Sequence, residues 1–151
     1  MSVIESVGPQ AIPELKKQVE KILAEAKLQG ATACEVAVSA QQGLATSVRQ
    51  REVETVEFNR DQGFSITVYQ GQQKGSASTT VAGDDAVRKT VAAALAIAQH
   101  ASPDEYAGLA DKALMATEFP DLDIWHPWEL SPAQAIEMAL ECEAAAFATD
   151  P

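Results

Sequence analysis

The sequence is poor in the side chains that most catalytic and nucleic-acid-binding sites require. Its 151 residues include two histidines, two cysteines and eleven Lys or Arg, against 22 Asp or Glu, and the formal net charge is -11. Nucleic-acid binding depends largely on Lys and Arg that neutralise phosphates. We therefore predict no direct binding of nucleic acid, and the same charge disfavours binding to an anionic membrane surface.

Long apolar runs are also missing. The longest run, residues 91–98, is far shorter than a membrane span, which needs about 20 residues. The first ten residues lack the basic and apolar segments of a secretory signal. Cys34 and Cys142 form no C-x-x-C pair, and free buried thiols are typical of cytoplasmic proteins. We expect a soluble, cytoplasmic protein.

The composition is that of a globular domain, with 46% hydrophobic and 22% charged residues. A chain of this length predicts one domain or a piece of a larger chain. We expect residues 1–12 to be a leader and residues 13–151 to be the folded domain. The sequence stops directly after an alanine-rich helical pattern, which predicts a truncated chain.

Helical periodicity occurs at both ends of the sequence. Pro13 suits the first turn of a helix, and Gly30 suits its end. Apolar residues at helical spacing line one side of that segment, namely Leu15, Val19, Ile22, Leu23 and Ala26. A second helix is expected after a cap at Asp84. A capping box at Ser102 predicts a short helical turn, and a second one at Ser131 predicts a last helix. Residues 111–130, which lie between them, are expected to form an irregular connector.

Between the helices, alternating apolar and polar residues predict about five strands. These are residues 33–40, 44–49, 51–58, 64–69 and 74–80, with turns expected at 41–43, 59–63 and 70–73. The apolar positions of the third run do not keep one parity, which a bulge or an edge position would explain. The order predicts an α+β fold, with an antiparallel meander and all three helices on one face.

Neither histidine lies in a metal-binding or catalytic motif. A catalytic zinc site usually has three protein ligands and often a H-E-x-x-H helix. His100 is followed by Ala101, and His126 by Pro127, so we predict no metal ligand among these residues. His100 suits the end of a helix, and His126 a packed connector.

Other candidates for chemistry also have simpler explanations. Asp121 and Asp123 could hold a hard cation, but such ions need about six oxygen ligands in a spaced loop, and a surface turn is favoured. Hydroxyls between Ser76 and Thr80 lack a G-x-S-x-G motif and a nearby histidine. The glycines at 71 and 75 are not followed by the G-K-[ST] of a phosphate-binding loop.

One segment has small side chains on both faces of a predicted strand. Such a strand permits close approach of another backbone, and its edge could accept an extended peptide or a partner strand through main-chain hydrogen bonds. The favoured alternative is that this strand lies beneath a closely packed helix. The residues are Lys74, Gly75, Ser76, Ala77, Ser78 and Thr79.

Several ordered blocks of this sequence cover nearly all of the chain after the first helix. They are residues 52–59, Gly63, 66–69, 74–79, 92–98, 102–104, 107–111, 120–123, 126–127 and 131–132. In order and spacing, these blocks resemble the amino-terminal domain of PmbA (TldE)-type members of the TldD/PmbA metallopeptidase family, also called modulators of DNA gyrase.

The resemblance implies a cytoplasmic bacterial complex of a TldD-like and a PmbA-like subunit. This complex proteolyses extended or poorly folded peptides and matures a microcin precursor. It also implies that a zinc-type metal is held by the TldD-like partner, on a helix outside this domain. No cofactor and no catalytic residue is then expected here. The acidic composition does not support a role at gyrase. The alternatives are a stand-alone peptide-binding module that uses strand addition, and an independent enzyme, for which no ligand cluster is present.

Overall fold

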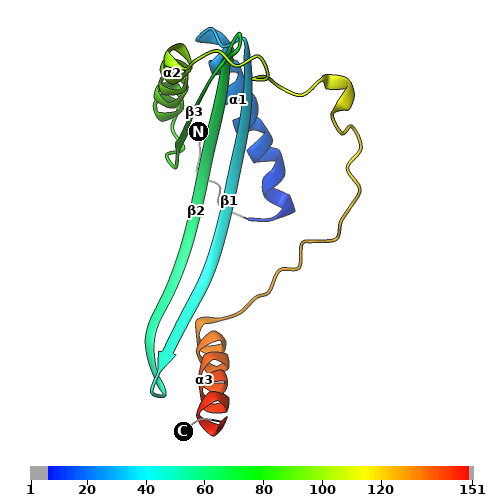
Figure 1. The fold of residues 1–151 in the computed structure, drawn as a ribbon. Coiled ribbons are helices and arrows are strands. Elements are labelled where there is room, and N and C mark those ends of the chain that lie inside the picture. Colours follow the sequence, from blue (N-terminus) through cyan, green and yellow to red (C-terminus); the bar gives the residue numbers. More distant parts are fainter. Residues whose placement is uncertain (1–6, 150–151) are drawn as a thin grey trace. The chain divides into compact units, whose positions relative to one another are not determined.

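The computed structural model describes residues 7–149, which contain α-helices and one antiparallel sheet (Figure 1). Residues 1–6 of the expected leader lie outside the described part. The α-helices are α1 (Ile12–Leu28), α2 (Asp84–His100) and α3 (Pro132–Thr149), and short 3-10 turns occur at Pro9–Ala11 and Lys112–Leu114. The strands are β1 (Ala33–Arg49), β2 (Glu52–Gln70) and β3 (Gln73–Thr79) in the order β1-β2-β3. The α+β prediction is confirmed.

The prediction of about five strands is wrong, because the sheet has three strands within residues 7–149. The expected strands 33–40 and 44–49 are both part of β1, and the expected strands 51–58 and 64–69 are both part of β2. The turns expected at 41–43 and 59–63 are therefore extended strand. The turn around Gly71 is confirmed: its φ is 59°, and β2 pairs with β3 from Phe64–Thr79 to Gln70–Gln73.

The glycines that suggested turns instead leave room for a side chain of the neighbouring strand. A Cβ on Gly43 would lie 2.7 Å from Asn59 Oδ1, and one on Gly63 would lie 3.0 Å from Ser39 Oγ. Glycine inside a strand commonly permits such an approach. Sequence composition alone does not distinguish this role from a turn.

The true turn of the long hairpin lies at Gln50 and Arg51, with φ of 54° and 66°. Positive φ at both central residues is typical of a two-residue hairpin loop, but Asn-Gly or Asp-Gly usually occupies it. Glu143 of α3 compensates: its carboxylate accepts the N–H groups of Gln50 at 2.7 Å and of Arg51 at 2.8 Å. A contact distant in sequence therefore supports this turn.

The chain forms two compact units, each with its own contacts. The first contains residues 1–40 and 61–122, and the second residues 41–60 and 123–151. In the first unit, Phe64, Ile66 and Val68 alternate along β2 and are fully buried. They pack in one core with Ile22 and Ala26 of α1 and with the buried side of α2, so both helices cover one face of the sheet.

Helix α2 follows the predicted pattern closely. Its buried residues are those expected from helical spacing, Val87, Val91, Ala94, Leu95 and Ala98. The cap differs, because Gly83 occupies the N-cap position and Asp84 is the first helical residue.

Helix α1 differs more from its predicted pattern. Its buried residues are Gln18, Ile22 and Ala26, while Leu23 is exposed. The Gln18 side chain is accommodated in the core because its Oε1 accepts a hydrogen bond of 2.9 Å from Gln62 Nε2 of β2. A buried amide requires such a partner, which the helical pattern cannot identify.

Helix α2 lies unusually close to β3. A Cβ on Gly75 would lie against the backbone oxygen of Ala94 and 2.5 Å from the backbone nitrogen of Ala98. Both positions along the helix carry alanine, so the two backbones meet with almost no side chain between them. The small residues of β3 are what permit this packing.

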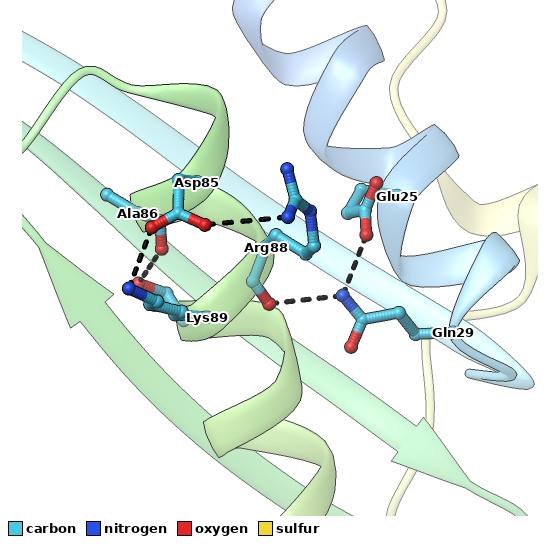
Figure 2. A network of polar contacts seen from close by, with 7 residues as sticks. Glu25, Gln29, Asp85, Ala86, Arg88 and Lys89 are labelled. Carbon is cyan, nitrogen blue, oxygen red and sulfur yellow. Dashed lines mark hydrogen bonds and ion pairs between the residues drawn. The ribbon is translucent and has the colours of Figure 1, made fainter.

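A polar network joins the ends of α1 and α2 (Figure 2). Gln29 Nε2 donates to Glu25 Oε1 at 2.8 Å and to the backbone oxygen of Arg88 at 3.1 Å. On α2, Lys89 Nζ lies 2.7 Å from Asp85 Oδ2. The hydrogen bond and charge of Lys89, with a smaller contribution from Arg88, lower the pKa of Asp85. The network orients two helices whose apolar sides share the core.

In the second unit, α3 packs along the end of the β1–β2 hairpin. The expected capping box is confirmed, with Ser131 N–H donating to Gln134 Oε1 at 3.0 Å and Gln134 N–H to Ser131 Oγ at 3.3 Å. Thr46 Oγ1 of β1 donates to the backbone oxygen of Ala135 at 3.3 Å. The Thr46 bond and the two bonds to Glu143 fix α3 against the hairpin.

The connector is irregular, as expected, except for one 3-10 turn at Lys112–Leu114. The capping box predicted at Ser102 is wrong. The side-chain Oδ1 of Asp104 accepts a hydrogen bond from the Tyr106 N–H at 2.9 Å, and the backbone oxygen of Asp104 accepts one from the Ala107 N–H. These two bonds form an isolated turn. An aspartate side chain can close such a turn by itself, without a following helix.

We expect Gly75→Ala to destabilise the first unit by about 1–3 kcal/mol, the usual range for overpacking. The added methyl group would meet backbone atoms of α2, which cannot move aside as a flexible side chain can. Thermal unfolding measures the effect. Gly108→Ala is the matched control, since nothing lies within 4 Å of its Cβ position. Equal melting temperatures for the two variants would contradict this account of the α2–β3 contact.

We expect Glu143→Ala to expose the hairpin turn by removing the acceptor for two N–H groups, at a cost of about 1 kcal/mol. Amide hydrogen exchange of Gln50 and Arg51 should speed up several-fold. Glu141→Ala, on the same helix, is the control and should leave both amides unchanged. Unaltered exchange in Glu143→Ala would show that the turn is stable without α3.

Candidate functional site

The segment predicted to form an accessible edge, residues 74–79, lies entirely in β3. This strand is at the outside of the sheet, and among residues 7–149 its only strand neighbour is β2. The strand therefore has one backbone edge without a strand partner. Such an edge presents a row of N–H and C=O groups to an incoming extended chain.

The two faces of β3 differ. Gly75 is buried and Ala77 half-buried on the side of α2, while Lys74, Ser76 and Ser78 are exposed on the other side. The alternative favoured from sequence, a strand beneath a closely packed helix, thus describes one face correctly. Strand addition would use the edge rather than this covered face, and it stays a prediction.

A shallow open hollow of about 500 Å³ lies at the end of β3 in the first unit. All three strands contribute to it, mostly with small or hydroxyl-bearing side chains. Its lining has no ionisable side chain, so it can form hydrogen bonds with neutral groups but cannot supply acid–base catalysis. The lining residues are Ala37, Ser39, Gly63, Phe64, Ser65, Ser78, Thr79 and Thr80.

The hydroxyls of β3 are those of an ordinary strand. Ser76 Oγ lies 2.8 Å from Thr67 Oγ1 of β2, a cross-strand pair in register. Thr79 Oγ1 accepts the N–H of Val81 at 3.1 Å, where the chain leaves the sheet. These bonds stabilise the sheet and do not activate a nucleophile, which would need an adjacent base.

The two histidines occupy separate surface positions. His100 is the last residue of α2. His126 Nε2 lies 2.6 Å from the backbone oxygen of Asp123, in the connector. His126 is exposed, so the expectation that it is packed is wrong. Its neighbours in the connector are exposed as well and provide no surface to cover it.

Within the described residues, no three His, Cys, Asp or Glu side chains come together in a group that could hold a metal ion. Asp121 and Asp123 lie on the exposed connector and complete no such group. These described residues therefore offer no donor group for the zinc-type metal that the resemblance implies. None of the helices within residues 7–149 combines the length and the apolar character of a membrane span.

The cysteines are both free, but only one is partly covered. Cys34 on β1 is half-buried against the core, whereas Cys142 on α3 is exposed. The expectation that Cys142 is buried is therefore wrong, because α3 packs through one side only. Burial, and secondarily the charge of Glu35, raise the pKa of the Cys34 thiol.

Comparison with known proteins identifies the family to which this chain belongs. The family model for the PmbA/TldA metallopeptidase domain 1 matches residues 34–98, from the start of β1 to α2. The metalloprotease PmbA of Escherichia coli O157:H7 is 52% identical over 128 residues. The chain belongs to the PmbA/TldD metallopeptidase family. The metalloprotease PmbA homologue of Haemophilus influenzae is 46% identical to the chain described here over 137 residues.

This PmbA/TldD-family chain spans less than a third of the relatives it matches. The alignments cover 85% and 91% of the chain, but 28% and 30% of the two relatives. The crystal structure of TldE from Thermococcus kodakarensis has a TM-score of 0.67 at 18% identity, and the match covers 88% of this chain and 30% of that one. At this identity the likeness supports a shared fold.

We expect a maleimide at neutral pH to modify Cys142 well before Cys34. Cys142 is exposed, whereas Cys34 is half-buried and its raised pKa keeps the reactive thiolate scarce below that pKa. Mass spectrometry of peptides after brief labelling measures the order. Cys142→Ser is the control and should remove the fast phase alone. Equal rates for both thiols would contradict the described environment of β1.

Proposed function

We propose that this chain is the non-catalytic amino-terminal domain of a PmbA/TldE-like subunit in a TldD–PmbA metalloprotease complex. The observation that carries the proposal is its close match to the metalloprotease PmbA, at 52% identity over 128 residues. We place the metal in a TldD-like partner; the described residues contain no group of three side chains that could hold one. Bond cleavage would then occur outside this domain.

The domain helps to build the assembly rather than the catalytic centre. Large apolar side chains on its connector support this role, because a partner that covers them would remove their apolar surface from water. Phe119 is 82% exposed and Trp128 is 70% exposed. A partner subunit or another part of the polypeptide would cover them.

The substrates are extended or unfolded peptides, and the complex acts in peptide maturation in the cytoplasm, including that of a microcin-type precursor. The β3 edge and the neighbouring hollow support this substrate class, since uncharged hydroxyls and free main-chain groups suit an extended backbone. Enclosure by the assembly would exclude folded proteins. Partner contact or peptide binding at β3 involves residues 74–79.

Co-purification with a TldD-like subunit tests the complex. The protein expressed from its complete reading frame should elute with that subunit at micromolar concentration, and cleavage of an unfolded peptide should require both proteins and be lost on metal chelation. Separate elution would refute the complex, as would full activity without the TldD-like subunit.

A lysine on the β3 edge tests the role of that strand. We expect Ser78→Lys to weaken association or peptide cleavage by about tenfold, because charged lysines block strand addition. Ser102→Lys is the matched control, since both serines are exposed and Ser102 lies outside the sheet. Peptide binding with no TldD-like partner would favour a stand-alone module. Equal behaviour of the two variants would exclude the β3 edge.

A further inference from the structure

A second backbone edge lies on β2, in the unit formed with α3. β3 pairs with β2 only from Phe64 to Gln70. Over residues 52–60, β2 therefore has β1 on one side and, among residues 7–149, no strand on the other. All nine of these residues are exposed. Because residues 52–60 are all exposed, no buried face requires their apolar positions to keep one parity.

Apolar side chains accompany the open edge. Val56 and Phe58 are 45% and 68% exposed, and they point to the same face because side chains alternate along a strand. Proteins usually protect such edges with charged side chains, lysine above all, with proline or with a covering element, and the charges here are three glutamates and Arg60. Residues 52–60 contain neither proline nor lysine. An apolar strand edge of this length is suited to pairing with another chain.

The charge of this unit indicates the chemistry of its partner. Residues 41–60 and 123–151 contain nine Asp or Glu against three Arg and no Lys. On the strand, Glu54 forms an ion pair with Arg49 of β1, while Glu52 and Glu57 are exposed carboxylates. Two copies of so acidic a unit repel each other, whereas a basic segment is attracted.

We propose that the β2 edge at residues 52–60 binds an extended polypeptide segment in which apolar side chains alternate with Lys or Arg. Main-chain hydrogen bonds add the segment to the sheet, its apolar side chains contact Val56 and Phe58, and its cations lie on the opposite face of the strand, on the side of Glu57. This edge is separate from β3, and the binding does not depend on the proposed protease complex.

A fluorescent nine-residue peptide with alternating Val or Phe and Lys tests the pairing, with the 151-residue chain and fluorescence anisotropy. Two N-methylated versions, each modified at one alternate set of residues, are compared with the unmodified peptide. Only one set of N–H groups in a strand faces a given neighbour. We expect one modified peptide to bind about tenfold more weakly or worse, and the other almost normally. Equal affinities would overturn strand addition.

Variants locate the peptide. We expect the double change Val56→Thr and Phe58→Thr to weaken binding by about tenfold, the usual scale for losing anchor contacts. Val81→Thr is the control, because Val81 is also exposed but lies outside this unit. Thermal unfolding should be unchanged in both. Glu57→Lys should weaken binding most at low salt, where charges are least screened.

Other outcomes would also overturn the proposal. Unchanged binding in the double variant would show that the peptide does not contact Val56 and Phe58. Loss of binding in Ser78→Lys would place the peptide at β3. Equal affinity for a peptide with glutamate in place of lysine would exclude charge recognition. Size-exclusion chromatography with light scattering covers the remaining case: a dimer of the chain that the double variant abolishes would show that the edge pairs with a second copy.

Discussion

The contact between Gly75 and the backbone of α2 is the constraint on which the first unit depends. It sets how closely a helix can approach the outermost strand, at a position where any Cβ would meet main-chain atoms of Ala94 and Ala98. Once α2 is fixed at this distance, its apolar side meets the alternating residues of β2 and the buried face of α1 in one core. The polar network between Gln29 and Arg88 then orients the two helices.

The same packing separates the two surfaces of β3. One face is used to bind α2, so its small side chains serve the fold first, and a functional role is left to the edge and to the hollow beside it. The second unit leaves several apolar or thiol side chains exposed. Its helix contacts the hairpin through a single side, and Cys142 as well as the apolar residues Val56 and Phe58 of β2 stay exposed. Exposed apolar patches commonly mark interaction sites.

Particular residues show where sequence patterns are informative. The spacing of Val87, Val91 and Ala98 predicts the buried side of α2 because helical periodicity is a local property. The capping box at Ser131 was equally predictable, since its hydrogen bonds join residues three apart. The burial of Gln18 was not predictable, because it depends on Gln62, which is 44 residues away in the sequence. The hairpin turn at Gln50 was missed for the same reason, since its N–H groups are satisfied by Glu143.

The sequence by itself determined the α+β class, the helix positions, the family and the scarcity of metal-binding side chains. These follow from local periodicity, composition and ordered motifs. Only the tertiary structure decided that five strand patterns form three strands, that Gly43 and Gly63 lie inside strands, and that β2 has an open edge. The reason is physical: a glycine beside polar residues has the same local preference in a turn as at a close strand contact, and the neighbouring strand selects between them.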